Sequence, residues 1–554
     1  MVSSNTVSWK ARTRIEFHPS VQGIVLFLVI MLGLFLCAAP ALAAGGGCPT
    51  GNTTVDPNGN PISLSSLGIA SCFYVSKSTG SDTNNGTSES TPWAHLPGMP
   101  SCTGNCASTT PAAGEGFILR GGESWTSSDL PIAWTWSGTG SNPFYIGVDP
   151  SWYNSSTCGA AWCRPILNEG RGNSDIFGLS NESYIIIDRP EVKGFTNQGT
   201  VINAQGSGTN IRVTGLYAHG WSWASGGNNT GIFRDGGAGT IADHFIIDGS
   251  DSTQNTENGF FGSWSQIQYG YISYVVSGVL GSVDIVHDVE LTNKITSVDG
   301  DHCNSIFGFS PLTSNGEIYY NLLLHGGNSC SGGVVLWFNG NGGTGNFVNY
   351  GFNNIIYNES SNPVNIGNHG AGNYGTYYWF NNTVDCTVGG CGGAPPTGPF
   401  FTVYDQNNHV IPSALNFDSS PSGGRTPVCN NGKGTGCTDL TQSESVANGQ
   451  GYTASETYSY SPISSCTPST CGTVQHGTDV QSWCTALSAI NATAGAACQS
   501  STSDACTYNT TNHTLSCPNN ALNARTSAWD IGSYEYGTQD APPNPPTGLS
   551  AVVN

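Results

Sequence analysis

The 554-residue chain contains 75 glycines, only 9% charged residues and a formal net charge of −21. A field of that sign repels phosphate backbones, which argues against nucleic acid as a partner; it would also repel an anionic polysaccharide unless a basic groove or a bound cation intervenes. The glycines follow no Gly-X-Y period, and together with 37% apolar residues they favour many short strands joined by tight turns over collagen.

The start of the chain predicts export. Basic residues at 10–14 precede an apolar run at 24–39, and Ala41-Leu42-Ala43 supplies the small residues that signal peptidase requires. The alternative is a membrane anchor, but the apolar run is shorter than the ~20 residues of a bilayer span. We therefore expect a signal peptide over residues 1–43 and a protein that is secreted, periplasmic or at the cell surface, with no membrane span after cleavage.

Cysteine usage agrees with export. The chain has 19 cysteines, and Cys37 leaves with the signal, so an even number remains, which in an exported chain indicates disulfides. Zinc is not expected, because no C-x-x-C pair occurs and histidines do not cluster with cysteines. The spacing predicts mostly local pairs: Cys48–Cys72, Cys102–Cys106, Cys158–Cys163, Cys303–Cys330, Cys386–Cys391, Cys429–Cys437, Cys466–Cys471, Cys484–Cys498 and Cys506–Cys517.

Short apolar runs recur roughly every 20 to 35 residues, which is typical of a solenoid. One set of runs begins at Tyr184, Ile211, Phe245, Ile272, Asp284, Glu317, Asn354 and Tyr378. A second set reads GIFRDG, GFFGSW, NSIFGFS, GVVLWFN and VNIGNHG, and each member follows a polar corner. Corners such as Asn353-Asn354 and Asn381-Asn382 suit this interpretation, because Asn tolerates the left-handed conformation.

The fold class predicted is all-β, a right-handed parallel β-helix with disulfide-stapled loops. A β-sandwich array and a propeller are the alternatives, but both prefer cleaner alternation and more uniform hairpins. One short helix is expected near the C-terminus, at about 480–497, where apolar residues recur at helical spacing. The predicted domain spans residues 44–537, divided into an N-terminal cap and first coils (72–183), central coils (184–400) and Cys-rich C-terminal coils with a cap (401–537). Residues 538–554 are predicted to form a Pro-rich linker that leads into the possible start of a fibronectin type III-like module.

Several segments resemble secreted proteins of the pectate-lyase-like β-helix superfamily. Residues 73–76, 80–87 and 91–93 resemble the N-terminal motif of that group, 114–122 its following G-D-x-[VI]-x-[LF]-R-G-G segment, and 524–536 its closing segment. The resemblance implies the β-helix fold over about 72–537. It does not choose among the polysaccharide lyases, glycoside hydrolases, epimerases and adhesins of the superfamily.

The densest polar constellation lies in NKITSVDGDHCNS. Asp299 and Asp301 could act as an acid/base pair or bind Ca²⁺, His302 could shuttle a proton, and Lys294 could serve as a base. The motif resembles the Asp-rich pair of β-helix pectin hydrolases, although the companion N-T-D and R-I-K segments of those enzymes are missing. The alternative is a turn, in which Gly300 supplies a positive φ and the aspartates cap backbone N–H groups.

The second set of strands also predicts an outward stripe of rings and charges. Its members are Arg234, Trp264, Phe309, Trp337 and His369, and His219 with Trp223 would extend it by one coil. Arg234 is also a catalytic candidate beside the cluster at 294–302. Aromatic faces stack on the apolar faces of sugars, so the stripe would line a glycan groove. The alternative is that these rings fill the corners of the coils.

The loop at 82–86 offers oxygens to Ca²⁺, but a hydrogen-bonded turn is the favoured interpretation. Two classes of function remain open. One is a carbohydrate-active enzyme, a polysaccharide lyase or glycoside hydrolase acting on a cell-wall or uronic-acid polysaccharide, with calcium as the one cofactor considered. The other is a non-catalytic glycan-binding or adhesive surface protein. A monomer is expected in either case.

Overall fold

The computed structural model describes residues 45–536 apart from 197–198, 205, 223–230, 235, 253–257, 296–302, 326–333, 339–345, 358–361, 367–373, 392–399, 414, 416–425, 430–438, 453–460, 504, 518–522 and 526–527. The predicted signal peptide and the predicted C-terminal linker lie outside these residues.

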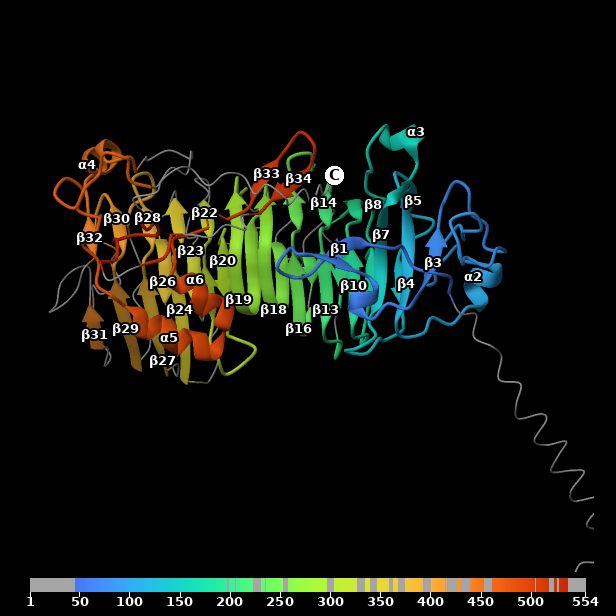
Figure 1. Ribbon diagram of the computed structural model, residues 1–554, viewed down its shortest axis with the longest axis horizontal. Coiled ribbons are helices and arrows are strands. Elements are labelled where there is room, and N and C mark those ends of the chain that lie inside the picture. The colour runs from blue at the N-terminus through green and yellow to red at the C-terminus, as the bar shows by residue number, and fades with distance from the viewer. Residues whose placement is uncertain are drawn as a thin grey trace, which may run out of the picture. The chain divides into compact units, whose positions relative to one another are not determined.

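The described chain winds through three parallel sheets, here called A, B and C, and each coil pairs with the coil before and after it (Figure 1). Two long strands, β18 (Asn258–Ser273) and β19 (Ser277–Thr292), each pass through all three sheets. They pair in parallel from Asn258↔Ser277 to Ser273↔Thr292. The predicted parallel β-helix is confirmed by this pairing.

Sheet A also contains β3 (Ser71–Val75), β4 (Glu115–Gly121), β7 (Phe144–Tyr153), β10 (Ile185–Asp188), β13 (Ile211–Thr214), β16 (Gly237–Asp243), β21 (Ile318–Tyr320), β24 (Asn346–Phe352), β27 (Tyr374–Phe380), β29 (Phe400–Gln406) and β31 (Thr426–Cys429). Sheet B contains β5 (Ser124–Thr126), β8 (Ile166–Gly172), β11 (Glu191–Phe195), β14 (Tyr217–His219), β17 (Ile246–Asp248), β22 (Leu323–His325), β25 (Ile355–Tyr357), β28 (Thr383–Asp385), β30 (His409–Ile411) and β32 (Leu440–Thr441). Sheet C contains β6 (Ile132–Trp134), β9 (Phe177–Leu179), β12 (Ile202–Asn203), β15 (Gly231–Arg234), β20 (Ile306–Gly308), β23 (Val334–Phe338) and β26 (Asn362–Ile366).

The core lies inside the coils. It is built from columns of side chains that occupy equivalent positions in successive strands. Side chains alternate between the two faces of a strand, so every second residue points inward. The inward column of sheet C is apolar and fully buried throughout: Phe177, Ile202, Phe233, Phe260, Val279, Ile306, Leu336 and Val364.

Sheet A turns into sheet B at a corner of two residues, and the first residue of the corner has a positive φ. This residue is asparagine in four successive coils: Asn321 (φ 51°), Asn353 (55°), Asn381 (54°) and Asn407 (58°). Asparagine is among the few residues with a side chain that adopt this conformation readily. The predicted role of Asn353 and Asn381 at tight corners is therefore confirmed.

The second corner residue forms a ladder of amides. Asn354, Asn382 and Asn408 are buried, and each side-chain oxygen accepts a hydrogen bond from the backbone N–H of the preceding coil. The side-chain nitrogens donate to backbone carbonyls in the sheet A strand of the preceding coil. These amides satisfy backbone groups that the sharp turn would otherwise leave unpaired.

Terminal segments cover the outer faces. Near the N-terminus, β1 (Asn52–Val55) and β2 (Pro61–Ser63) form an antiparallel pair, followed by a 3-10 turn, η1 (Ser65–Leu67). After the last coils the chain returns through α4 (Glu444–Gly449), α5 (Gln481–Ile490), α6 (Ala492–Cys498) and an antiparallel hairpin of β33 (Thr507–Asn509) and β34 (Thr514–Ser516). Figure 1 shows α5 and α6 beside β24 and β27, and the hairpin near β14.

The single helix predicted at 480–497 is two helices. Asn491 breaks the segment, and its side chain accepts a hydrogen bond from the N–H of Ala494 at the start of α6. Asparagine is a strong N-cap, so it restarts the helix in a new direction. Two further short helices, α2 (Gly104–Ser108) and α3 (Ser155–Cys158), lie between the first strands.

Seven of the predicted disulfides are present: Cys48–Cys72, Cys102–Cys106, Cys158–Cys163, Cys386–Cys391, Cys466–Cys471, Cys484–Cys498 and Cys506–Cys517. Cys303 is also disulfide-bonded, and its predicted partner Cys330 lies outside the described residues. The predicted pair Cys429–Cys437 involves a residue outside them as well.

Candidate functional site

The described residues include only part of the predicted chemical cluster. Asp299, Asp301 and His302 lie outside the described residues, so neither their convergence nor a Ca²⁺ site is tested. Lys294 is described and is 8% exposed, and its Nζ donates a hydrogen bond to the carbonyl of Cys303 at 2.7 Å. Elsewhere in the described chain, no group of three His, Cys, Asp or Glu side chains is placed to hold a metal ion.

The strand register corrects the predicted stripe. The outward column of sheet C runs Arg234, Phe261, Leu280, Phe307 and Trp337. Arg234 and Trp337 hold their predicted places, although Trp337 is only 9% exposed. Phe261 and Phe307 stand where Trp264 and Phe309 were predicted.

The stripe position predicted for Trp264 is wrong because its ring belongs to the core. Trp264 is 0% exposed and packs edge-on against Phe260, with ring centroids 5.1 Å apart. The chain bends at Gly262 (φ 91°), which carries Trp264 past the column and around the corner. His369 and Trp223, also predicted as glycan contacts, lie outside the described residues.

A polar cleft of about 450 Å³ lies over the N-terminal part of this column. Arg234 is the one basic side chain among its lining residues, and Asp175 and Glu182 are the two acidic ones. The cleft is also lined by Pro131, Ala133, Trp134, Thr135, Asn173, Ser174, Gly178, Ser180 and Asn203.

Hydrogen bonds hold Asp175 on both carboxylate oxygens. Oδ1 accepts from the N–H and the hydroxyl of Thr200 at 2.9 and 3.0 Å, and Oδ2 accepts from Nδ2 of Asn203 at 2.8 Å. Asn203 stands next to Arg234 in the outward column. Asp175 therefore fixes the amide that faces the cleft beside the guanidinium.

Glu182 is held on one oxygen only. Its Oε2 accepts from the backbone N–H groups of Ser180 and Asn181 at 2.6 and 2.9 Å. Within the described chain, Oε1 accepts no hydrogen bond, so this oxygen is available to a ligand or a proton. Chemically, the cleft combines one available carboxylate oxygen, one guanidinium and several amide and hydroxyl groups.

Apolar side chains continue the column beyond the cleft. The guanidinium carbon of Arg234 lies 5.9 Å from the ring centroid of Phe261, which begins this part. Phe307 contacts the rings of Trp337 and Phe309, with centroids 4.6 and 5.4 Å away. Phe261, Leu280, Phe307 and Trp337, named here the ring strip, thus adjoin the polar cleft on one face.

His219 does not extend this column, contrary to the prediction that it contacts glycan with the stripe. It ends β14 in sheet B, and both of its ring nitrogens contact carboxylates, Nδ1 to Asp251 at 2.7 Å and Nε2 to Glu191 at 3.1 Å. A ring engaged on both nitrogens by the protein has none left for a substrate.

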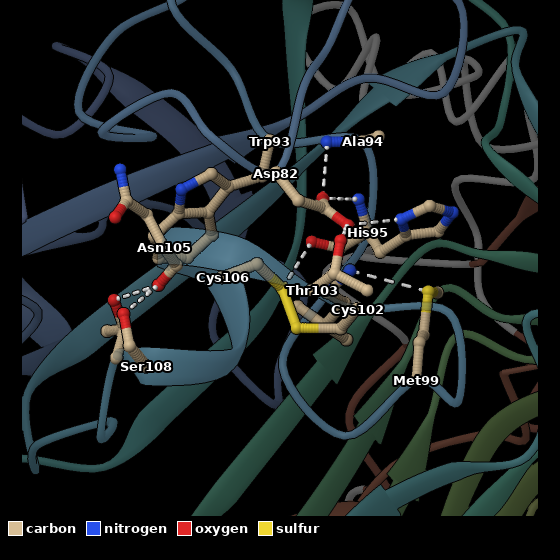
Figure 2. The surroundings of a disulfide bond; sticks show 12 residues. Asp82, Trp93, Ala94, His95, Met99, Cys102, Thr103, Asn105, Cys106 and Ser108 are labelled. Atoms are coloured by element: carbon tan, nitrogen blue, oxygen red, sulfur yellow. Dashed lines mark hydrogen bonds and ion pairs between the residues drawn. A yellow bond between two sulfur atoms is a disulfide. The ribbon is translucent and has the colours of Figure 1, made fainter.

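The loop at 82–86 is a hydrogen-bonded turn, as the favoured interpretation had it, since the N–H of Asn84 donates to the carbonyl of Ser81 at 2.8 Å. Figure 2 shows the carboxylate of Asp82, which begins the loop, with the groups that donate to it. The carboxylate of Asp82 accepts from the N–H groups of Ala94, His95 and Thr103 at 3.0–3.1 Å, and from Nδ1 of His95 at 2.7 Å. With this many donors the carboxylate anchors the segment that carries the Cys102–Cys106 disulfide.

Sequence reasoning missed Asp175, Glu182 and Asn203. Asp175 and Glu182 flank the short strand FGL, and Asn203 ends the strand IN. At such places polar residues look the same whether they end a strand or face a ligand. The signal that could have found them is the register, which puts Asn203 beside Arg234.

Comparisons with known proteins add the following. A scan against protein-family models finds no match, and a search of curated proteins finds none. Among solved structures, pectate lyase Pel9A is similar over 85% of this chain and 98% of its own, with 11% identity and a TM-score of 0.35. A GH136 lacto-N-biosidase from Eubacterium ramulus is similar over 64% of this chain and 67% of its own (11% identity, TM-score 0.34). A rhamnogalacturonan lyase is similar over 64% and 84% respectively (14% identity, TM-score 0.30). Similarity this low leaves the function open, and the β-helix rests on the strand pairing itself.

In the described part of the chain, no helix is both long and apolar enough to cross a bilayer.

Proposed function

We propose that the protein is exported and carbohydrate-active, and that it holds a polysaccharide chain along the outer face of sheet C. We further propose that it acts on this chain as a polysaccharide lyase or a glycoside hydrolase. The observation that carries the proposal is the continuity of one outward column, which runs from the polar cleft around Arg234 into the ring strip.

The dimensions of the column suit a polymer. Neighbouring strands lie ~4.8 Å apart, so the rungs from Ala133 to Trp337 span about 34 Å. That length exceeds what a single sugar needs. Rings and aliphatic side chains suit the apolar faces of sugars, while hydroxyl, amide and charged groups suit their hydroxyls.

The chemistry proposed for the cleft centres on Glu182 and Arg234. The available oxygen of Glu182 is placed to accept or deliver a proton, as both lyase and hydrolase reactions require. Arg234 would neutralise an anionic group of the substrate or of the reacting centre. Asp299, Asp301 and His302 precede β20 in the chain, and we retain them as a proposed second chemical cluster with Ca²⁺ as its candidate ligand.

One observation favours the alternative, a glycan-binding protein without catalysis. Hydrolysis of glycosides ordinarily needs two carboxylates that can both act on the bond. Asp175 is fully engaged by Thr200 and Asn203, so the described part of the cleft offers a single working carboxylate.

The test is a panel of polygalacturonate, xylan, mannan and arabinogalactan, with binding measured by affinity electrophoresis. We expect Arg234→Ala to weaken retention by about tenfold or more, because a hydrogen bond to a charged group is lost. Arg171→Ala is the matched control, since Arg171 is exposed and does not line the cleft. Retention that is equal in the two variants would refute the placement of the glycan.

Products distinguish the reactions. A lyase releases unsaturated, ultraviolet-absorbing uronates, and a hydrolase releases reducing ends without that absorbance. Glu182→Gln should abolish either release while binding is kept. If the parent binds glycan but releases nothing, the non-catalytic alternative holds.

A further inference from the structure

His219 joins three segments of the chain on the outer face of sheet B. Glu191 belongs to β11, His219 ends β14, and Asp251 lies in the segment 249–252 that follows β17. The His219 side chain is 12% exposed, that of Glu191 18% and that of Asp251 53%. Each ring nitrogen is within hydrogen-bond distance of one carboxylate.

This geometry requires the charged form of the ring. A neutral imidazole has one N–H, so it can donate to one carboxylate and must turn a lone pair toward the other. An imidazolium donates to both. Burial alone would lower the pKa of His219, but the hydrogen bonds and charges of Glu191 and Asp251 outweigh burial and raise it.

Deprotonation would release Asp251 rather than Glu191. Glu191 keeps a second cation, because Nζ of Lys193 lies 2.8 Å from the same Oε1. Burial raises the pKa of Glu191, but its hydrogen bonds from His219 and Lys193 lower it to about 2. Asp251 is half-exposed and loses little by returning to water, so its contact breaks at the smaller cost.

Other charged and titratable groups face His219 from every side. Arg164 lies close enough to act on Glu191 electrostatically. The ring of Tyr217 stacks on that of His219 at 4.3 Å, and His513 of the returning hairpin stacks on the other side of Tyr217 at 4.7 Å. Tyr508 contacts both His513 and Asp248. Burial, and then the charge of His219, lower the pKa of His513, whereas the pKa of His219 is raised.

The release of Asp251 would loosen the adjoining segment. Its Oδ1 accepts from the N–H of Gly220 at 2.8 Å, and Ser252 Oγ accepts from the N–H of Trp221 at 3.2 Å. Trp221 packs so closely on Gly249 that an added Cβ there would lie 2.6 Å from the indole. In the chain, the segment at 219–222 leads toward β15 with Arg234, and the segment at 249–252 leads toward β18 with Phe261.

We propose that His219 is a positioning residue that makes the glycan face of sheet C dependent on pH. When it is charged, His219 clamps the segment 249–252 to β11 and β14. When it is neutral, it releases Asp251 and with it the segment 249–252, which precedes β18 in the chain. The clamp itself stands on the contacts of His219, and only its consequence for ligand rests on the proposed function.

Amide hydrogen exchange of the peptide containing Gly220 and Trp221 tests the clamp without any ligand. After correction for intrinsic rates, protection of the Gly220 amide should fall by about tenfold between pH 6 and pH 8.5, the factor that a hydrogen bond to a charged group supplies. In Asp251→Asn and in His219→Gln this dependence on pH should vanish. His476→Ala, which removes an exposed histidine, should keep it.

Protection of the β13 amides shows whether each variant is folded and should stay constant throughout. Equal protection of Gly220 at both pH values in the parent would overturn the proposal, and so would a transition that survives in His219→Gln. Where polygalacturonate or another panel glycan binds, its retention should weaken above the same pH in the parent and not in Asp251→Asn. If no glycan binds, the proposed function fails while the exchange result still decides the clamp.

Discussion

The outer face of sheet A is covered in two different ways along one column of side chains. In the N-terminal half the column reads Asp188, Thr214, Asp243 and Gln268, and in the C-terminal half Tyr320, Phe352 and Phe380. His287 stands between the halves: Nδ1 contacts Asp288 at 2.5 Å, and its ring stacks on Tyr320 at 4.6 Å.

The polar half lies under the N-terminal segment, whose backbone carbonyls need hydrogen-bond donors. Arg212 donates to the carbonyl of Val55 at 2.7 Å, Arg189 donates to that of Thr53, and Gln268 donates to that of Pro57. Arg212 is itself held by Asp243, with 2.8 Å between Nε and Oδ2. An irregular segment or edge strand has carbonyls to satisfy, and long polar side chains reach them.

The aromatic half lies under helix α5, whose backbone is already bonded within itself. Tyr320, Phe352 and Phe380 stack with centroids 4.9 and 5.3 Å apart, and Trp483 of α5 packs edge-on to Phe380 at 5.3 Å. The comparison indicates that the side chains of each half match the segment that covers them: polar under irregular backbone, aromatic under a helix.

The largest effect should come from breaking the polar half. Arg212→Leu leaves Asp243, whose side chain is 0% exposed, without its guanidinium, although His244 still contacts it at 2.8 Å. We expect the free energy of unfolding in urea to fall by about 3–5 kcal/mol, the usual cost of an unpaired buried charge. The double variant Arg212→Leu, Asp243→Leu should recover much of the loss, and a single-variant loss below about 1 kcal/mol would contradict this account.

A carboxyl to which no described residue donates a hydrogen bond sharpens the contrast. Glu290 stands on the outer face of sheet B between Tyr271 and Leu323, and burial raises its pKa to about 7. The folded value lies above the unfolded one, so the stability that protonated Glu290 contributes is lost as the pH rises from about 4.5 through about 7. Glu290→Gln should stabilise the protein by roughly 2 kcal/mol at pH 8 and change little at pH 4. Thermal melts across that range measure the difference, and a variant that parallels the parent throughout would disprove it.

The smallest effect should come from the aromatic half. Phe352→Leu keeps an apolar side chain but removes two ring stacks, for which we expect about 1–1.5 kcal/mol. Because no charge is involved, the loss should be the same at pH 5 and pH 8 and at low and high salt. Urea titrations under the four conditions check this, and a strong salt dependence would show that the two halves are coupled.

The fold could be predicted because apolar residues recur at the inward-facing positions of successive coils. Asn353 and Asn381 could be placed at corners because asparagine adopts a positive φ readily. The apolar runs could be placed as strands. The outward side has no such constraint, since a parallel register tolerates nearly any residue there. The run that begins at Gly259 holds three large rings, and the sequence alone does not show which of them faces outward. Trp264 was therefore given the outward place that the register gives to Phe261.

The candidate site was predicted only in part. Arg234 was identified because the second set of runs places it in the predicted outward stripe. Asp175 and Glu182 could not be distinguished from ordinary corner residues, because their importance comes from strands that meet only in the folded coil.

The return of the chain over its own coils has a consequence for the order of events in folding. Coils can stack one after another as the chain becomes available, because each needs only its neighbour. The hairpin contact between Tyr508 and Asp248 joins residues 260 positions apart, and that between Arg525 and Asn353 joins residues 172 apart. Such contacts close late. The stack of Phe352 and Phe380 likewise forms before α5, which follows it in the chain, can cover it. During synthesis, this apolar face therefore stays exposed until the returning segment has been made.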